Sequence, residues 1–196
     1  HMGSTDRFIR FAARIAVENQ PVDEWSALAL NETDPMTASL ALIALSRQGD
    51  ASLQGDLIEA LGRFNLTKTD ETTTLALLRA YALCFTRMGE PDQSIKDSVI
   101  ARLDPLLPAK SDEVNTELLR VLVYLDTPGI IEKGLALMAD SRPEVIPDWA
   151  ELISRNTGYG STIQKMLDNH PPSLKIYYAL MLRNIRYGWS MQQREE

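Results

Sequence analysis

The chain has 196 residues, 44% of them hydrophobic and 24% charged, which is the composition of a globular rather than a disordered protein. A formal net charge of −7 argues against nucleic acid as a partner, because phosphate contacts need clustered Lys and Arg and the densest basic segment is Arg183 with Arg186. No apolar run approaches the roughly 18–20 residues of a membrane-spanning helix, so we expect no direct membrane insertion.

The first four residues, 1–4, resemble a cloning remnant, and we expect a single domain over residues 5–196. Apolar residues recur at helical spacing nearly throughout, and no segment alternates for long as a half-buried strand does. A first helix is expected over about 6–19. Its apolar face consists of Phe8, Ala12, Ile15 and Ala16. A short second helix follows Pro21 and carries Trp25, Leu28 and Ala29.

Three longer helices follow, and each has a shorter partner. Their starts are expected near residues 34, 70 and 111. Asp34 and Ser111 cap the first and the third of them, and Pro35 stands at the first position of the first. The shorter partners are expected after Asp50, over about 92–103 and after Pro128. A long helix, a Gly or Pro turn and a shorter helix, repeated about every 40 residues, is typical of HEAT-like or armadillo-like α-solenoids. An irregular helical bundle is the alternative.

The same pattern predicts a core between consecutive helix pairs, because one pair alone buries only part of its apolar surface. Six large side chains on the apolar sides of the long helices are expected to be buried there: Leu42, Leu45, Tyr81, Phe85, Leu118 and Leu122.

The regular pattern ends at about residue 139, and residues 140–196 are less regular. Prolines and glycines there leave room for two short helices, about 148–154 and 161–168, and for a better one over about 173–186. Gly188 is expected to end that last helix. Ser190 is expected to cap a further turn that belongs to a larger protein, of which this chain is a truncated part.

The sequence offers few side chains that could act in catalysis or bind a metal ion. A nucleophile needs a base, and the one histidine outside the cloning remnant is His170, in a proline-rich connector. Cys84 stands alone among apolar residues and reads as a buried side chain. Haem, zinc and iron–sulfur ligand sets are missing. We therefore expect no cofactor, no metal and no enzymatic activity in this domain.

Acidic residues are numerous, but the adjacent pairs fall at expected helix starts, where carboxylates interact well with the helix dipole. These pairs are Asp23 with Glu24, Asp70 with Glu71, and Asp112 with Glu113. A structural role is favoured over a catalytic one, which leaves a hydrolase that uses these acidic residues as a distant alternative.

Aromatic residues gather in the C-terminal third. Most are expected to pack in the core, and four are candidates for a contact surface: Tyr159, Tyr178, Tyr187 and Trp189. The last helix is apolar on more than one side, since Ile176 and Leu180 cannot share one stripe with Tyr178 and Met181. We therefore expect an exposed apolar edge that docks a further helix or domain and favours weak self-association.

Several segments resemble the HEAT-like helical region of very large exported proteins of planctomycete-type bacteria. They are RFAARIAVENQPVDEW, ALLRAYALCFTRMGEPD, ARLDPLLPAKSDEVNTELLRVLVYLDTP and RNTGYGSTIQKMLDNHPPS. Such proteins combine the helical region with a sugar-dehydrogenase-like propeller and a c-type cytochrome. The resemblance implies a periplasmic or envelope location and a spacer or docking role. It carries over no catalytic or haem residue.

Two functions therefore stand as hypotheses. The first is a non-catalytic scaffold that spaces or docks the other domains of an exported redox protein, or a separate protein partner. The alternative is a carbohydrate- or small-ligand-binding module that uses the aromatic residues of the C-terminal third.

Overall fold

The computed structural model describes residues 1–140, 162, 165 and 172–194, and over these residues the chain is helical, with no strand. It divides into two compact units, His1–Ile130 and Ile131–Glu196. The helices expected over 148–154 and 161–168 lie almost wholly outside the described residues.

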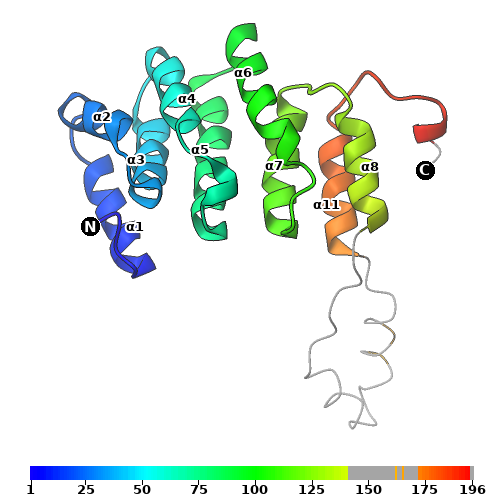
Figure 1. Ribbon diagram of the computed structural model, residues 1–196, viewed down its shortest axis with the longest axis horizontal. Coiled ribbons are helices and arrows are strands. Elements are labelled where there is room, and N and C mark those ends of the chain that lie inside the picture. Colours follow the sequence, from blue (N-terminus) through cyan, green and yellow to red (C-terminus); the bar gives the residue numbers. More distant parts are fainter. Residues whose placement is uncertain (141–161, 163–164, 166–171, 195–196) are drawn as a thin grey trace. The chain divides into compact units, whose positions relative to one another are not determined.

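The first unit contains seven α-helices (Figure 1). They are α1 (Arg7–Glu18), α2 (Val22–Asn31), α3 (Pro35–Gln48), α4 (Gln54–Gly62), α5 (Glu71–Met88), α6 (Gln93–Leu103) and α7 (Asp112–Tyr124). Single turns of 3-10 helix precede α4 (η1, Ala51–Leu53), precede α5 (η2, Leu66–Lys68) and follow α6 (η3, Asp104–Leu106). Since α3, α5 and α7 begin at Pro35, Glu71 and Asp112, the spacing expected from the sequence is confirmed.

The helix starts follow from capping side chains. Asp34 Oδ2 accepts the Thr37 backbone N–H at 2.9 Å, and Asp70 Oδ1 accepts that of Thr73 at 3.1 Å. Ser111 accepts the Val114 N–H in the same way. Each cap satisfies a backbone donor that the first helical turn leaves without a partner.

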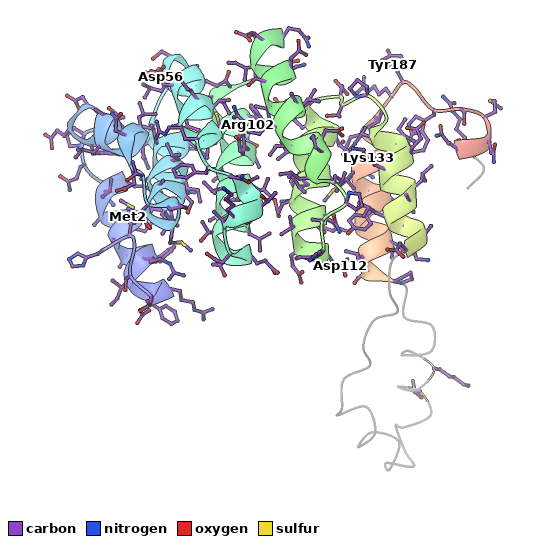
Figure 2. All side chains as sticks on the ribbon, viewed as in Figure 1. Met2, Asp56, Arg102, Asp112, Lys133 and Tyr187 are labelled. Atoms are coloured by element: carbon purple, nitrogen blue, oxygen red, sulfur yellow. The ribbon has the colours of Figure 1, made fainter. Side chains whose placement is uncertain are left out.

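The helices of this unit form two rows. In one row α3 packs against α1 and α5, and α5 packs against α7; in the other α4 contacts α2 and α6. Contacts of α3 with α2 and α4, of α5 with α4, and of α6 with α7 join the rows. Arg102 of α6, labelled in Figure 2, lies against Gly62 of α4 and donates to the Tyr81 hydroxyl of α5 at 3.3 Å, so one side chain links three helices.

The core lies where the sequence predicts it. The six expected side chains are each at most 3% exposed: Leu42, Leu45, Tyr81, Phe85, Leu118 and Leu122. Small residues let α3 and α5 approach closely, and Ser46 of α3 donates to the Leu42 carbonyl at 2.8 Å and lies 3.5 Å from the Ala80 carbonyl of α5.

The N-terminal helix is oriented differently from the expectation that its apolar face packs inward. Phe8 is 69% exposed, and Ala12 and Ala16 are exposed as well. The side chains of Arg14 and Glu18 are instead 12% and 4% exposed. Helix α1 packs mainly on α3, so few of its side chains are buried. The ion pair between Arg14 and Glu18 offsets part of the cost of burying these two charged side chains.

The second unit contains α8 (Ile130–Asp140), α11 (Ser173–Leu182) and a 3-10 turn, η4 (Gln192–Arg194). Helix α8 approaches α11 closely at Gly134, where a Cβ would lie 2.7 Å from Leu182. Helix α11 ends four residues before the expected 186, because the Asn184 side chain donates to the carbonyls of Leu180 and Met181 and so caps the helix end. Ser190 accepts the Gln193 N–H at 3.2 Å and caps the final turn, as expected.

Candidate binding surfaces

The predicted contact residues have different positions in the structure. Tyr159 lies outside the described residues. Tyr178 is only 1% exposed, so the expectation that it contributes to a contact surface is wrong for this structure. Spacings of three and four residues place Tyr178, Met181 and Leu182 on one side of α11, and Leu182 lies against α8, which makes this the buried side.

Five large apolar side chains of the second unit are exposed, three on α11 and two in the segment after it, and they are here named the α11 patch. Its members are between 41% and 85% exposed: Ile176, Tyr177, Leu180, Tyr187 and Met191. Ile176 and Leu180 belong to the outward side of α11, and Tyr187 and Met191 to the segment after it. The apolar exposure expected at this end of the chain is therefore present, and it includes Tyr187, one of the predicted contact residues, whereas Tyr178 is buried.

Trp189, another predicted contact residue, lines a groove of about 530 Å³ within the second unit. Its indole N–H donates to the Ile185 carbonyl at 2.8 Å, which fixes the ring. Gln193 donates to Glu132 of α8 at 2.9 Å, and this hydrogen bond holds the pKa of the Glu132 carboxyl below its usual value. The groove lining also includes Leu135, Met138, Ala179, Leu182, Arg183, Ile185, Arg186 and Arg194.

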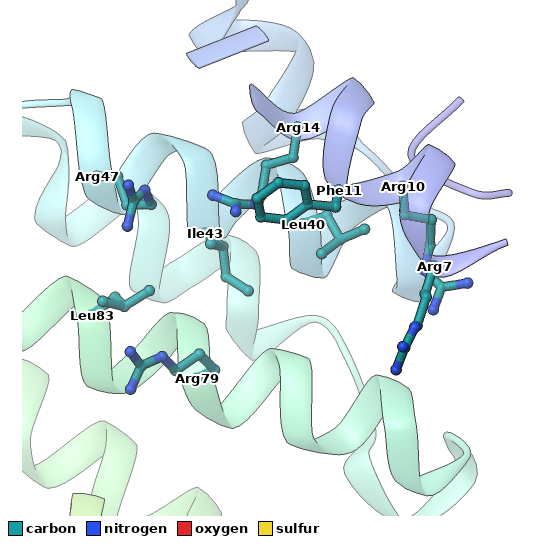
Figure 3. A pocket seen from close by; sticks show the side chains of 9 residues that line it. All are labelled: Arg7, Arg10, Phe11, Arg14, Leu40, Ile43, Arg47, Arg79 and Leu83. Carbon is teal, nitrogen blue, oxygen red and sulfur yellow. The ribbon is translucent and has the colours of Figure 1, made fainter. Parts of the chain in front are cut away.

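A second groove, of about 370 Å³, lies in the first unit among α1, α3 and α5 (Figure 3). Five arginines line it, three from α1 and one each from α3 and α5: Arg7, Arg10, Arg14, Arg47 and Arg79. Its apolar lining consists of Phe11, Leu40, Ile43 and Leu83. We name this surface the arginine groove. It contains a quarter of the chain's 20 lysines and arginines, although the protein as a whole is acidic.

Sequence reasoning missed the arginine groove. Arg7, Arg10 and Arg14 are spaced by three and four residues, which places them on one side of a helix and is a signal that could have been read. Arg47 and Arg79 come from other helices, and only the fold brings them to the same groove.

A third cavity, of about 490 Å³, lies between the start of α5 and the start of α7. Leu78, Val114, Leu118 and Thr74 line its inner part, and Glu71 and Lys110 are its only charged residues. This lining provides no convergent set of reactive groups.

Cys84 and the carboxylates of Asp34 and Asp70 make contacts that stabilise the fold. Burial raises the pKa of the Cys84 thiol to about 12, which keeps it protonated and a poor nucleophile near neutral pH. Hydrogen bonds from Thr37 and Thr73 lower the pKa values of the Asp34 and Asp70 carboxyls, the opposite direction from that of a general acid. In the described part of the chain, no group of three or more His, Cys, Asp or Glu side chains converges to hold a metal ion. His170 lies outside these residues.

The acidic pairs named from the sequence do stand at helix starts. Asp23 and Glu24 are in the first turn of α2, and Asp112 and Glu113 are in that of α7. Asp70 caps α5, which begins with Glu71.

Among the described residues, no helix is both long and apolar enough to cross a membrane. No protein-family model, no curated protein and no solved structure matches the chain.

Proposed function

We propose that this chain is a non-catalytic docking domain, an α-solenoid of HEAT-like antiparallel helix pairs, that binds a neighbouring domain or a protein partner. The near-40-residue spacing of α3, α5 and α7 and the two rows of helices in the first unit support this architecture. In repeat arrays of this kind each helix pair contacts its neighbours and the extended faces serve for binding.

The α11 patch is the observation that carries the proposal. Five apolar side chains, each more than 40% exposed, occur within 16 residues of sequence on and just after one short helix. Isolated exposed apolar residues are ordinary, but a cluster of them is typical of an interaction site. The family resemblance suggests the setting: a large exported redox protein of the cell envelope, whose other domains the helical region spaces.

Light scattering tests this role of the patch. We expect weak self-association of the wild-type protein at high concentration, and we expect Leu180→Asp to reduce it. Leu28→Asp is the matched control, because Leu28 is 74% exposed but belongs to α2 in the first unit. A protein that stays monomeric at high concentration, or an equal response to both substitutions, would contradict the role of the α11 patch.

A carbohydrate-binding function remains the second candidate, on the single observation that Trp189 lines a groove together with the Gln193 amide. Stacking on an indole and hydrogen bonds to an amide are how proteins hold sugars. Titration with soluble oligosaccharides would test it: the candidate predicts a change in tryptophan fluorescence that Trp189→Ala abolishes.

A further inference from the structure

We propose that the arginine groove binds an acidic peptide segment that carries an apolar side chain at its centre. The groove belongs to the first unit, while the α11 patch belongs to the second, so the inference stands on a different surface from the proposed function.

The charge of the groove is strongly positive. Five guanidinium groups line it, and the carboxylate that neutralises part of this charge is Glu18. Glu18 pairs with Arg14 and lies 3.0 Å from Nε of Arg47, so one carboxylate serves two arginines. In the described part of the chain, no carboxylate pairs with Arg7 or Arg79. Positive charge is therefore left for a ligand.

Several of the arginines are held in place before any ligand binds. Arg10 donates to the main-chain carbonyl of Thr5 at 3.0 Å. The Arg14 guanidinium lies 5.2 Å from the centre of the Phe11 ring, and Arg7 lies 4.7 Å from that of Phe8. Guanidinium groups ordered in this way lose less conformational entropy when they bind a carboxylate.

The arrangement of the arginines favours an extended ligand over a single small anion. Figure 3 shows Arg7 and Arg10 at one end, Arg47 and Arg79 toward the other, and the apolar side chains of Leu40 and Ile43 between them. A free phosphate needs donors that converge on one point. Carboxylates on both sides of an apolar side chain match this order of charged, apolar and charged positions.

The size of the groove also fits a peptide. Neighbouring packed helices are about 8–10 Å apart, so a groove across α1, α3 and α5 spans roughly 16–20 Å. An extended chain covers about 3.3 Å per residue, so about five or six residues cross it. The apolar lining residues Leu40 and Ile43 lie on α3, between the other two helices, and Phe11 of α1, which is 58% exposed, supplies the accessible apolar surface of the groove.

The probe for the test is a fluorescein-labelled peptide of about ten residues, in which glutamates flank a central Phe-Leu pair. Its binding to the full chain is followed by fluorescence anisotropy at low salt. We expect binding that weakens as salt is added, because the contacts are exposed ion pairs. The same peptide with glutamine in place of every glutamate should not bind. Equal binding of the glutamine peptide would overturn the proposal.

Substitutions then locate the site. Arg79→Glu should weaken binding at least about fivefold. The double substitution of Arg7→Glu and Arg79→Glu should weaken it at least about twentyfold. Neither arginine forms an ion pair with a described residue of the free protein, so these substitutions remove contacts with the peptide without breaking such an ion pair of the fold. Lys68→Glu is the control: Lys68 is exposed, lies outside the groove and undergoes the same charge reversal, so we expect less than about a twofold effect. Circular dichroism verifies that each variant is folded, and Arg79→Ala offers a milder change at the same position.

Three outcomes would overturn the proposal. Affinity that falls equally with Lys68→Glu and Arg79→Glu would mean attraction by overall charge. Displacement of the peptide by millimolar inorganic phosphate, beyond that caused by sodium chloride of equal ionic strength, would indicate a small-anion site. Arg79-dependent sedimentation with phosphatidylglycerol vesicles, without peptide binding, would indicate a lipid surface. None of these outcomes alters the light-scattering result at Leu180, so the two proposals fail independently.

Discussion

Helices α1 and α3 lie side by side, yet they distribute their apolar residues in opposite ways. Helix α3 contacts α1, α2, α4 and α5, and eight of its fourteen residues are buried. Helix α1 packs mainly on α3 and buries none of its twelve residues completely. Phe8, Ile9 and Phe11 are all at least 47% exposed.

The difference shows that the number of neighbouring helices determines how many sides of a helix can bury apolar residues. A helix with neighbours on several sides can be apolar almost all round, because other helices cover most of its surface. A helix at the edge has one covered side, and in α1 that side holds the paired Arg14 and Glu18 rather than the phenylalanines. Apolar residues in a sequence therefore do not by themselves identify the side that packs inward.

The largest effect is expected in the interior helix. Leu42→Ala should lower the free energy of unfolding by about 2–5 kcal/mol, because Leu42 is fully buried and its truncation leaves a cavity between rows of helices. Urea denaturation followed by circular dichroism measures this. A loss below about 0.5 kcal/mol would mean that α3 is not packed as described.

A smaller effect is expected at the helix starts, where the two helices can be compared directly. Asp34 caps α3 and Asp6 caps α1 through the same kind of hydrogen bond. Asp34→Ala should cost about 1 kcal/mol of global stability. Asp6→Ala should cost less, because α1 can fray without exposing a buried core. Equal losses in urea denaturation would indicate that α1 is as tightly coupled to the fold as α3.

The Asp34 cap also predicts a dependence on pH. Its pKa is lowered in the folded protein by hydrogen bonds from Thr37, so the unfolded chain binds the proton more readily. The stabilisation is present above the ordinary aspartate pKa of about 4 and is lost as pH falls below that value through the folded pKa. Wild-type and Asp34→Ala proteins should therefore differ in urea denaturation at pH 7 and converge in strong acid. A difference that stays constant down to pH 2 would contradict this.

The smallest effect is expected on the exposed side of α1. Phe8→Ala should change the free energy of unfolding by less than about 0.5 kcal/mol, since Phe8 is 69% exposed and loses little contact area. A loss comparable to that of Leu42→Ala would show that Phe8 packs inward in solution, as the periodicity of the sequence suggested.

Much of the fold could be predicted from the sequence, because helix starts are local events. Capping residues such as Asp34, Asp70 and Ser111 act within their own first turn, and the starts of α3, α5 and α7 were therefore predictable. Leu118 and Leu122 could also be placed in the core, since they follow Val114 at spacings of four residues on one apolar side of α7.

The binding surfaces depend on packing partners, which the sequence does not display. Whether Tyr178 or Leu180 of α11 faces outward is decided by which side α8 covers, and both sides are apolar. The arginine groove needs Arg47 and Arg79 beside the arginines of α1, and these residues are far apart along the chain. Only the fold brings them together.

Native-state hydrogen exchange tests the contrast between the interior and the edge most directly. The slowest amides of α3 and α5 should exchange only through global unfolding. The amides of α1 should exchange through local opening at a much lower free energy, although α1 is a regular and capped helix. Protection of α1 equal to that of α3, with the same response to urea, would mean that α1 is not an independently opening edge helix.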